Sequence, residues 1–382
     1  MALVLNEDQL LLKDSAQSFC QQLAPVSVLR RLRDSNDETG FDQAIWTQMV
    51  DLGWAGMAIP EAYGGYGFGY GGLGVVLEET GRTLVSSPLI STVLLAATAI
   101  NELGSEEQKQ ELLPKIVAGE LLVALALDEN SSHAPSRIGT KAEKSGDGFI
   151  LSGAKTFVLD GHVAQKLIVV ARSSGEIDSR QGLSLFLVDA GLEGIAISRT
   201  HMVDCRNAAK IEFSQVEVAA DALLGEVDAG FDGLDKVLDI ARIGLAAEML
   251  GSIQEVFERI LDFLKTREQF GILIGSFQGL QHRAATMYSE IELCKSVVRA
   301  ALAGLDDSGK SRQDIAELAS IVKAKLSEVF FEVSNEGIQM HGGIGMTDEF
   351  DIGFFLKRAR VAQHFLGDAS FHRDRYASLN NF

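Results

Sequence analysis

The sequence has few prolines, few cysteines and no long hydrophobic run. Proline occurs 5 times in 382 residues, so little interrupts long helices. Cys20, Cys205 and Cys294 lie far apart, which excludes metal-like spacing and a disulfide framework and indicates reduced thiols in a cytoplasmic protein. The most apolar stretch, near residues 94–100, is too short to cross a bilayer, and the acidic N-terminus does not resemble a signal peptide.

Basic residues are also scarce relative to acidic ones. The chain has 34 Lys and Arg against 53 Asp and Glu, which gives a formal net charge of -19. An acidic surface of this size argues against nucleic acid and anionic membranes as main partners, although a local basic site for an anionic cofactor is compatible with it. With 46% hydrophobic residues there is ample material for a core, and the length suggests two or three folding units.

The hydrophobic pattern changes twice along the chain. Up to residue 118 it is mainly helical, and we expect helices that begin after Asn6 and at 44–52, 73–84 and 86–103, then an amphipathic segment interrupted by Pro114. Short apolar runs separated by polar turns follow and predict strands at 121–127, 149–152, 155–159, 166–171, 183–188, 196–200 and 210–218. Helical periodicity then returns at 231–267, 277–305, 313–340 and after residue 349.

These changes predict three domains. They are an N-terminal helical domain at 1–118, a middle antiparallel β domain at 119–225, and a C-terminal four-helix bundle at 226–382. Long helices joined by short loops favour the bundle, and closely spaced short strands favour a barrel or sandwich.

Five motifs in this order resemble the acyl-CoA dehydrogenase family over essentially the whole chain. They are IPEAYGGYGFGYGGLGVVLEETGR (59–82), GDGFILSGAKTFVLDGHVAQKLIVVAR (146–172), KTREQFG (265–271), FQGLQHRAATMY (277–288) and QMHGGIGMTDEF (339–350). The resemblance implies a flavoenzyme with FAD between the β domain and the bundle, in dimers that commonly pair into tetramers. It also implies that a carboxylate removes an α-proton of an acyl-CoA, that the flavin takes hydride from the β-carbon, and that electrons pass to an electron-transfer flavoprotein.

The resemblance assigns cofactor contacts to the C-terminal motifs. Arg267 and Phe270 match the family's contacts to the FAD pyrophosphate and adenine across the dimer, and a guanidinium forms paired bonds to phosphate. Phe277 and Gln278 belong to a similar neighbourhood of the adenosine half. Gln339, Gly342 and Gly343 match the family's QxxGG signature, where glycine allows the backbone to approach phosphates closely.

In the β domain the sequence departs from the family pattern. The family usually has Thr-Glu-Pro followed by Gly-Ser-Asp, but this chain has Asp128 in place of the threonine, after Leu127. Phe157, Val158 and Leu159 occupy the stretch that packs on the flavin ring; Phe157 can stack, whereas Leu159 has no hydroxyl to donate. An acid such as Asp128 near an electron-rich reduced flavin is electrostatically unfavourable.

The catalytic glutamate is missing from both positions where the family keeps it. Leu366 stands at the position just before Gly367, and Ala241 stands before Arg242 on the long helix. One explanation is that the chain is one subunit of an α2β2 assembly whose sister chain carries the catalytic Glu. A second is that another carboxylate serves as the base, and the candidates are Asp239 and Asp368. Asp239 with Arg242 also resembles the family's contacts beside the CoA thioester.

Three functions therefore stay open at this level. We expect an FAD-dependent acyl-CoA dehydrogenase or its non-Glu subunit, with acyl-CoA and an electron-transfer flavoprotein as partners in a homo- or hetero-tetramer. The alternatives are a non-catalytic structural subunit of an α2β2 dehydrogenase, and a flavin monooxygenase or desulfinase on the same fold. The family has no metal, and we expect none here.

Overall fold

The computed structural model describes residues 4–382 and divides into two compact units. One unit contains a β-sheet and comprises residues 32–69 and 86–241; the other contains the long helices and comprises the N-terminal residues up to 31 together with 70–85 and 242–382. Helix α7 (Gly230–Thr266) runs from the first unit into the second.

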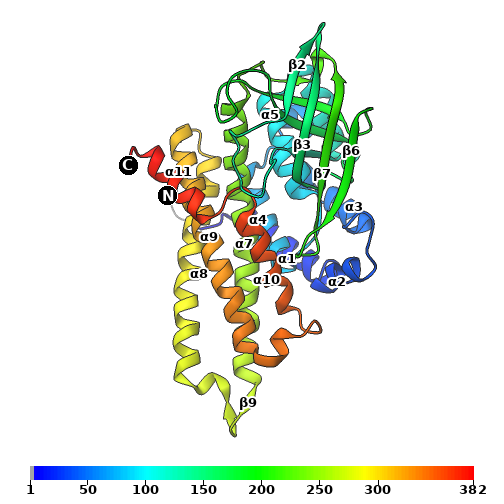
Figure 1. Ribbon diagram of the computed structural model, residues 1–382. Helices are drawn as coiled ribbons and strands as arrows, with labels where there is room; N and C mark the ends of the chain where they lie inside the picture. The colour runs from blue at the N-terminus through cyan, green and yellow to red at the C-terminus, as the bar shows by residue number, and fades with distance from the viewer. Residues whose placement is uncertain (1–3) are drawn as a thin grey trace. The chain divides into compact units, whose positions relative to one another are not determined.

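The sheet-containing unit is built on eight strands, several of which lie side by side in Figure 1. They are β1 (Val123–Ala126), β2 (Lys141–Ser145), β3 (Gly148–Leu159), β4 (Lys166–Arg172), β5 (Leu183–Asp189), β6 (Ile195–His201), β7 (Asn207–Val218) and β8 (Leu223–Leu224). Their order is β6-β7-β3-β2-β4-β5-β8, and β1 pairs with β4. The helices of this unit are α3 (Gln43–Asp51), a π-helix (Leu89–Ala97), α5 (Thr98–Leu103) and α6 (Glu106–Val117).

One face of the sheet forms the core of this unit. Buried and exposed residues alternate along most of β7, which is the pattern of a strand with one solvated face. The buried side chains include Leu151, Leu167 and Phe186, and the rings of Phe149 and Phe186 lie 5.0 Å apart. Removal of this apolar surface from water holds the strands together.

The predicted antiparallel pairing is correct for most of the sheet but not for β1. The pairs β2–β3, β3–β7, β6–β7, β4–β5 and β5–β8 are antiparallel, whereas β1 runs parallel to β4. All four residues of β1 are buried, as expected for a strand covered on both faces. Sequence analysis also missed β2, because its residues KAEKS are mostly exposed and polar.

The second unit is a bundle of long helices. Its members are α1 (Glu7–Leu23), α4 (Gly69–Arg82), the C-terminal part of α7, α8 (Gln278–Leu305), α9 (Arg312–His341), α10 (Ile352–His364) and α11 (Ala369–Leu379). Figure 1 shows α7, α8 and α9 side by side, with the short hairpin of β9 (Glu268–Gln269) and β10 (Ile272–Leu273) at one end. Capping boxes at Asn6 and Ser311 fix the starts of α1 and α9.

Two expectations about the N-terminal helices need correction. Pro114 does not interrupt its helix, since α6 continues to Val117 and Ala118 N–H still donates to the Pro114 carbonyl at 3.0 Å. Proline removes only the bond that its own N–H would have made, and here the helix tolerates that loss near its end. The segment expected as one helix over 86–103 consists of the π-helix followed by α5. Among the described residues, no helix is long and apolar enough to span a membrane.

Helices α4 and α7 approach each other very closely. A Cβ atom on Gly251 would lie 1.7 Å from the Glu78 carbonyl oxygen, and one on Gly81 would lie 2.0 Å from that of Glu248. The Ser252 hydroxyl donates to the Gly81 carbonyl at 2.8 Å. Only glycine permits this packing, which positions Glu248 inside the bundle.

Candidate active site

In the sheet-containing unit, the loop after β1 is fixed against the end of β3. Thr156 N–H donates to the Asp128 carbonyl at 2.7 Å. The Lys155 ammonium donates to the Leu127 carbonyl at 3.0 Å and to the Glu129 carboxylate at 2.7 Å. The two stretches that the sequence analysis assigned to the flavin ring, 127–128 and 157–159, therefore lie beside each other.

Lys155 is fully buried and Glu129 is partly buried, and this pair was not identified from the sequence. Burial lowers the pKa of Lys155 to about 8, although Glu129 opposes this change. Burial also opposes ionisation of Glu129, but Lys155 and the donors Thr140 Oγ1 (2.6 Å), Thr140 N (2.9 Å) and Gly139 N (2.7 Å) outweigh it and lower the pKa of Glu129. The signal in the sequence that could have identified this pair is Lys155, a charged residue in a mainly apolar strand.

The next three residues of β3 give this site an aromatic side chain. Phe157 has a φ of 56°, at an irregularity in the pairing of β3 with β7. Its ring is partly exposed, whereas Val158 and Leu159 are buried. Phe157 is therefore the residue of this stretch that can stack on a planar ring.

Asp128 has a partner that the sequence analysis did not anticipate. Its carboxylate Oδ1 lies 3.0 Å from His133 Nδ1, and the two side chains are 15% and 4% exposed. Asp128 and His133 are only five residues apart in the sequence. They lie in an irregular loop, however, and spacing along a loop does not predict which side chains are in contact. An acid in place of the family's threonine is thus not an isolated charge.

In the helical unit, Leu366 lies in the turn between α10 and α11. The side chain is 2% exposed, and both Leu366 and Gly367 have positive φ angles, 61° and 98°. Arg242 Nε donates to the Leu366 carbonyl at 3.2 Å, and His372 Nε2 lies 2.9 Å from the same oxygen. The backbone of the expected base position is therefore held by side chains from two other helices.

A buried lysine contacts two further carbonyls, one in this turn and one near the end of α10. The Lys323 ammonium donates to the Gly367 carbonyl at 2.7 Å, the Gln363 carbonyl at 3.1 Å and the Ser327 hydroxyl at 3.0 Å. Burial, reinforced by Arg242, lowers the pKa of Lys323 to about 7. Burial lowers the pKa of His372, and the cations Arg242 and Lys323 lower it further. The imidazole of His372 is therefore neutral.

The carboxylates considered as replacements for the missing base have other structural roles or are deeply buried. Asp368 caps α11 and accepts from Phe371 N–H at 2.8 Å. Glu248 forms a buried ion pair with Arg358 at 2.6 Å. Asp239 lies on α7, one turn before Arg242, and is fully buried.

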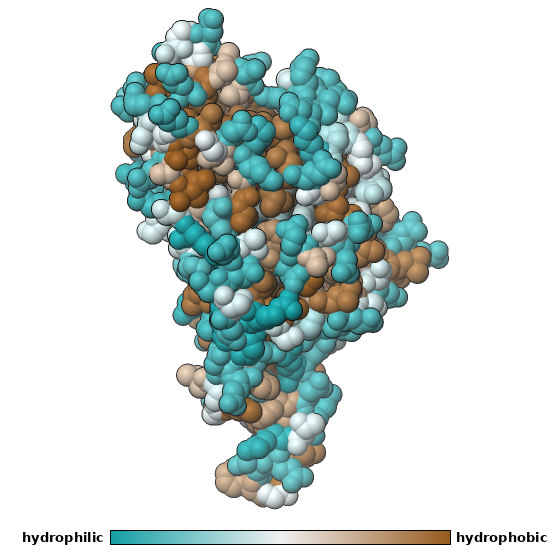
Figure 2. Space-filling view, turned by 90° about the vertical axis from the view of Figure 1, so that its right-hand side faces the viewer, coloured by the Kyte–Doolittle hydropathy of each residue, from teal (hydrophilic) through white to brown (hydrophobic). Residues whose placement is uncertain are grey.

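The residues expected to bind phosphates and adenine gather at the end of the bundle that carries the β9–β10 hairpin. The rings of Phe270 and Phe277 lie 6.3 Å apart, and Phe270 is 92% exposed. Arg267 is exposed, and its guanidinium has no ion pair in the part of the chain that the structure describes. Figure 2 shows apolar side chains among hydrophilic ones at this tip.

The glycine motif after α9 lies at the same end. The ring of His341 lies 4.5 Å from that of Phe263 on α7, and Arg283 on α8 pairs with Glu336 on α9 at 2.6 Å. Gly342 has a φ of 61°, and a Cβ atom there or on Gly343 would meet nothing within 4 Å. Gln339, Gly342 and Gly343 are exposed, so their backbone is open to a ligand.

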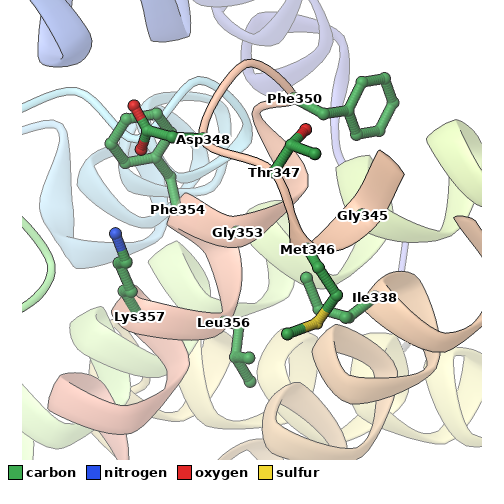
Figure 3. Close-up of a pocket in the computed structure, with 10 residues that line it drawn as sticks. All are labelled: Ile338, Gly345, Met346, Thr347, Asp348, Phe350, Gly353, Phe354, Leu356 and Lys357. Carbon is green, nitrogen blue, oxygen red and sulfur yellow. The ribbon is translucent and has the colours of Figure 1, made fainter. Parts of the chain in front are cut away.

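A pocket of about 310 Å³ opens beside this motif, between the turn after the glycines and α10 (Figure 3). Its lining is mainly apolar and includes Ile338, Met346 and Phe354. Asp348 and Lys357 are its charged residues. None of the residues predicted from the sequence lines this pocket.

Comparison with known proteins identifies the family. Models described as the N-terminal, middle and C-terminal domains of acyl-CoA dehydrogenase match residues 6–120, 126–216 and 228–378. Isovaleryl-CoA dehydrogenase from Pongo abelii is 32% identical over 97% of this chain and 88% of its own length. This chain belongs to the acyl-CoA dehydrogenase family. The predicted fold of helical, β and helical domains is thereby confirmed.

Two further relatives of this acyl-CoA dehydrogenase family chain are informative. Subunit CarC of the caffeyl-CoA reductase-Etf complex from Acetobacterium woodii is 28% identical, with 93% of each chain covered. The solved structure of the Tcur3481-Tcur3483 steroid ACAD is 32% identical, with a TM-score of 0.87 and 98% of each chain covered.

As a member of the acyl-CoA dehydrogenase family, the chain is an FAD-dependent flavoprotein oxidoreductase of CoA thioesters. The residues present fit this cofactor: Arg267 offers an unpaired guanidinium for phosphate, the glycine motif offers open backbone, and Phe157 offers a ring face. Among the described residues, no cluster of three or more His, Cys, Asp or Glu is arranged to hold a metal.

Proposed function

We propose that this chain is the non-Glu subunit of a heteromeric acyl-CoA dehydrogenase, in which a sister chain supplies the catalytic carboxylate. The observation that supports this assignment is the apolar character of both base positions. Leu366 is 2% exposed and Ala241 is fully buried, so neither position can accept a proton. The similarity to the Tcur3481-Tcur3483 steroid ACAD, which its description gives as a pair, also favours a heteromer.

The nearby carboxylates are poor substitutes for the missing base. Asp368 accepts a hydrogen bond as the cap of α11, and Glu248 is committed to Arg358. A general base needs an oxygen that can reach the substrate proton. Asp239 is the remaining candidate in a self-sufficient enzyme, and we keep it with Arg242 as a proposed contact beside the thioester.

The residues of this chain would hold FAD rather than perform proton abstraction. We assign Arg267 and the backbone at Gly342 and Gly343 to its phosphates. We assign Phe270, Phe277 and Gln278 to its adenosine half. Leu127, Asp128 and the stretch 157–159 would lie at the ring. When bound, FAD accepts a hydride from the β-carbon of the acyl group. Leu366 would exclude water from the place that a carboxylate takes in other members.

We further propose an acyl-CoA as the substrate and an electron-transfer flavoprotein as the electron acceptor. The relative CarC is a subunit of a complex that includes Etf, which supports this acceptor. The assembly we propose is a tetramer with the sister chain, and the domain boundaries we propose are 118/119 and 225/226.

The test is to purify the chain alone and after co-expression with a sister chain that carries the glutamate. We expect the co-expressed assembly to be yellow and to lose its absorbance near 450 nm when an acyl-CoA is added without oxygen. We expect the lone chain not to bleach. Bleaching of the flavin-loaded lone chain would contradict the subunit assignment, and its loss in Asp239→Asn would then identify Asp239 as the base.

A further inference from the structure

We propose that Lys155 is a positioning residue: with Glu129 it holds a β-bulge that turns Phe157 out of the core and towards the flavin ring. This inference rests on the proposed function, because that function places residues 157–159 at the ring. It adds a role for Lys155, whose side chain is fully buried and would act on the cofactor only through Phe157.

The bulge lies where β3 pairs with β7. Lys155 and Val158 are three residues apart, but their partners in β7 are only two apart, so β3 carries one extra residue here. Within this interval Phe157 has a φ of 56°, in the left-handed region that a bulky residue rarely adopts. Bulges bend a strand and re-aim its side chains, and they are frequent beside active sites.

The bulge changes the direction in which Phe157 points. In a regular strand residues two apart face the same side, so residue 157 would enter the core together with the fully buried Lys155. Instead Phe157 is partly exposed, and the consecutive residues Val158 and Leu159 are both buried. This break in the alternation leaves the ring of Phe157 accessible to a ligand.

Hydrogen bonds from the bulge tie it to the loop after β1. The Lys155 ammonium donates to the Leu127 carbonyl at 3.0 Å and to the Glu129 carboxylate at 2.7 Å. Thr156, which has no partner in the register with β7, donates its N–H to the Asp128 carbonyl at 2.7 Å. Three successive residues of the loop are therefore bonded to two successive residues of β3.

Glu129 is held in turn by three further donors. Its carboxylate accepts from Gly139 N–H at 2.7 Å, from Thr140 N–H at 2.9 Å and from the Thr140 hydroxyl at 2.6 Å. Burial lowers the pKa of Lys155 to about 8, while Glu129 and Asp128 oppose this change, so the ammonium form predominates at about pH 7. Removal of the ammonium takes away both contacts that this side chain makes with the loop, and Phe157 then loses its direction.

The experiment is a double-mutant cycle on FAD binding at about pH 7, followed by FAD fluorescence, with the chain alone and in its assembly with the sister chain. Phe157→Leu removes the ring, and Lys155→Met removes the ammonium but keeps a long side chain. We expect each variant to weaken FAD binding about tenfold, the scale of one aromatic contact. Because Lys155 acts through Phe157, the double variant should also lose about tenfold rather than about a hundredfold.

A second measurement needs no cofactor. In the flavin-free protein, hydrogen exchange of the Thr156 amide should be about tenfold faster in Lys155→Met than in the wild type, because the loop that accepts its bond is no longer held. Phe157→Leu should leave this exchange unchanged.

The control is Lys144→Met, since Lys144 is an exposed lysine of β2, which also pairs with β3. It should change neither FAD binding nor exchange at Thr156. If Lys155→Met folds poorly, Glu129→Gln weakens the same tie and should give the same pattern. Unchanged FAD binding in Lys155→Met, or a loss of about a hundredfold in the double variant, would overturn the inference alone. A wild-type protein that takes up no FAD in either form would overturn the proposed function and this inference with it.

Discussion

Replacement of Lys323 by methionine should change how the stability of the protein depends on pH. Burial lowers the pKa of Lys323 from its ordinary value of 10.5 to about 7, and Arg242 contributes to this shift. Between about pH 7 and pH 10.5 the unfolded chain binds a proton at Lys323 that the folded chain does not. Folding therefore becomes more favourable as the pH rises through this range. The cost of the buried charge is fully present below about pH 7 and fades towards pH 10.5.

The magnitude follows from the gap between these two values. At about 1.4 kcal/mol for each pH unit, a gap of about 3.5 units between 10.5 and about 7 corresponds to a total of about 5 kcal/mol. Between about pH 7 and pH 10 the wild type should therefore gain up to about 4 kcal/mol more than Lys323→Met. Urea unfolding at several pH values, followed by circular dichroism, gives this difference.

The control and the refuting result are both defined by the structure. Lys310 is exposed in the loop before α9, so Lys310→Met should leave the pH profile unchanged. Parallel profiles for the wild type and Lys323→Met would refute the reasoning. That result would mean that Lys323 stays protonated in the folded protein over the whole pH range. Its three hydrogen-bond acceptors, which match the three N–H donors of the ammonium, would then be the cause.

Three other outcomes are expected. Leu366→Glu, but not Leu366→Gln, should raise flavin bleaching by acyl-CoA in the lone chain about 100-fold or more, the scale of a general base, as measured by stopped-flow absorbance. Arg267→Ala should weaken FAD binding about tenfold or more because it removes a charge-assisted contact, and fluorescence of the reconstituted apoprotein checks this. Glu248→Ala should destabilise the protein by about 3–5 kcal/mol, since it removes the carboxylate of the buried ion pair with Arg358; urea unfolding measures this loss.

The long helices were predictable because their signals are local. The expected segments 231–267, 277–305 and 313–340 end within one residue of α7, α8 and α9. Over such lengths the hydrophobic period repeats many times, and the flanking loops carry capping residues such as Ser311. The strand β2 was not predictable in this way, since a polar sequence becomes a strand only through its neighbours.

The candidate site was predictable only where a motif carried it. Arg267 and the glycines after Met340 follow from the order of the motifs, and the structure brings them to one end of the bundle. The partners Lys155 and His133 follow from tertiary packing and loop shape, which leave no periodic trace in the sequence. The assignment of individual residues to cofactor and substrate stays a prediction.

The turn at Leu366 has a consequence for how such proteins evolve. Arg242 and His372 contact its carbonyl oxygen, and Lys323 contacts that of Gly367, so the turn is held through the main chain. These main-chain contacts do not depend on which side chain residue 366 carries. After a gene duplication, one copy can lose the catalytic carboxylate and keep the backbone conformation of the turn. The two copies can then form one enzyme in which only one of them carries the base.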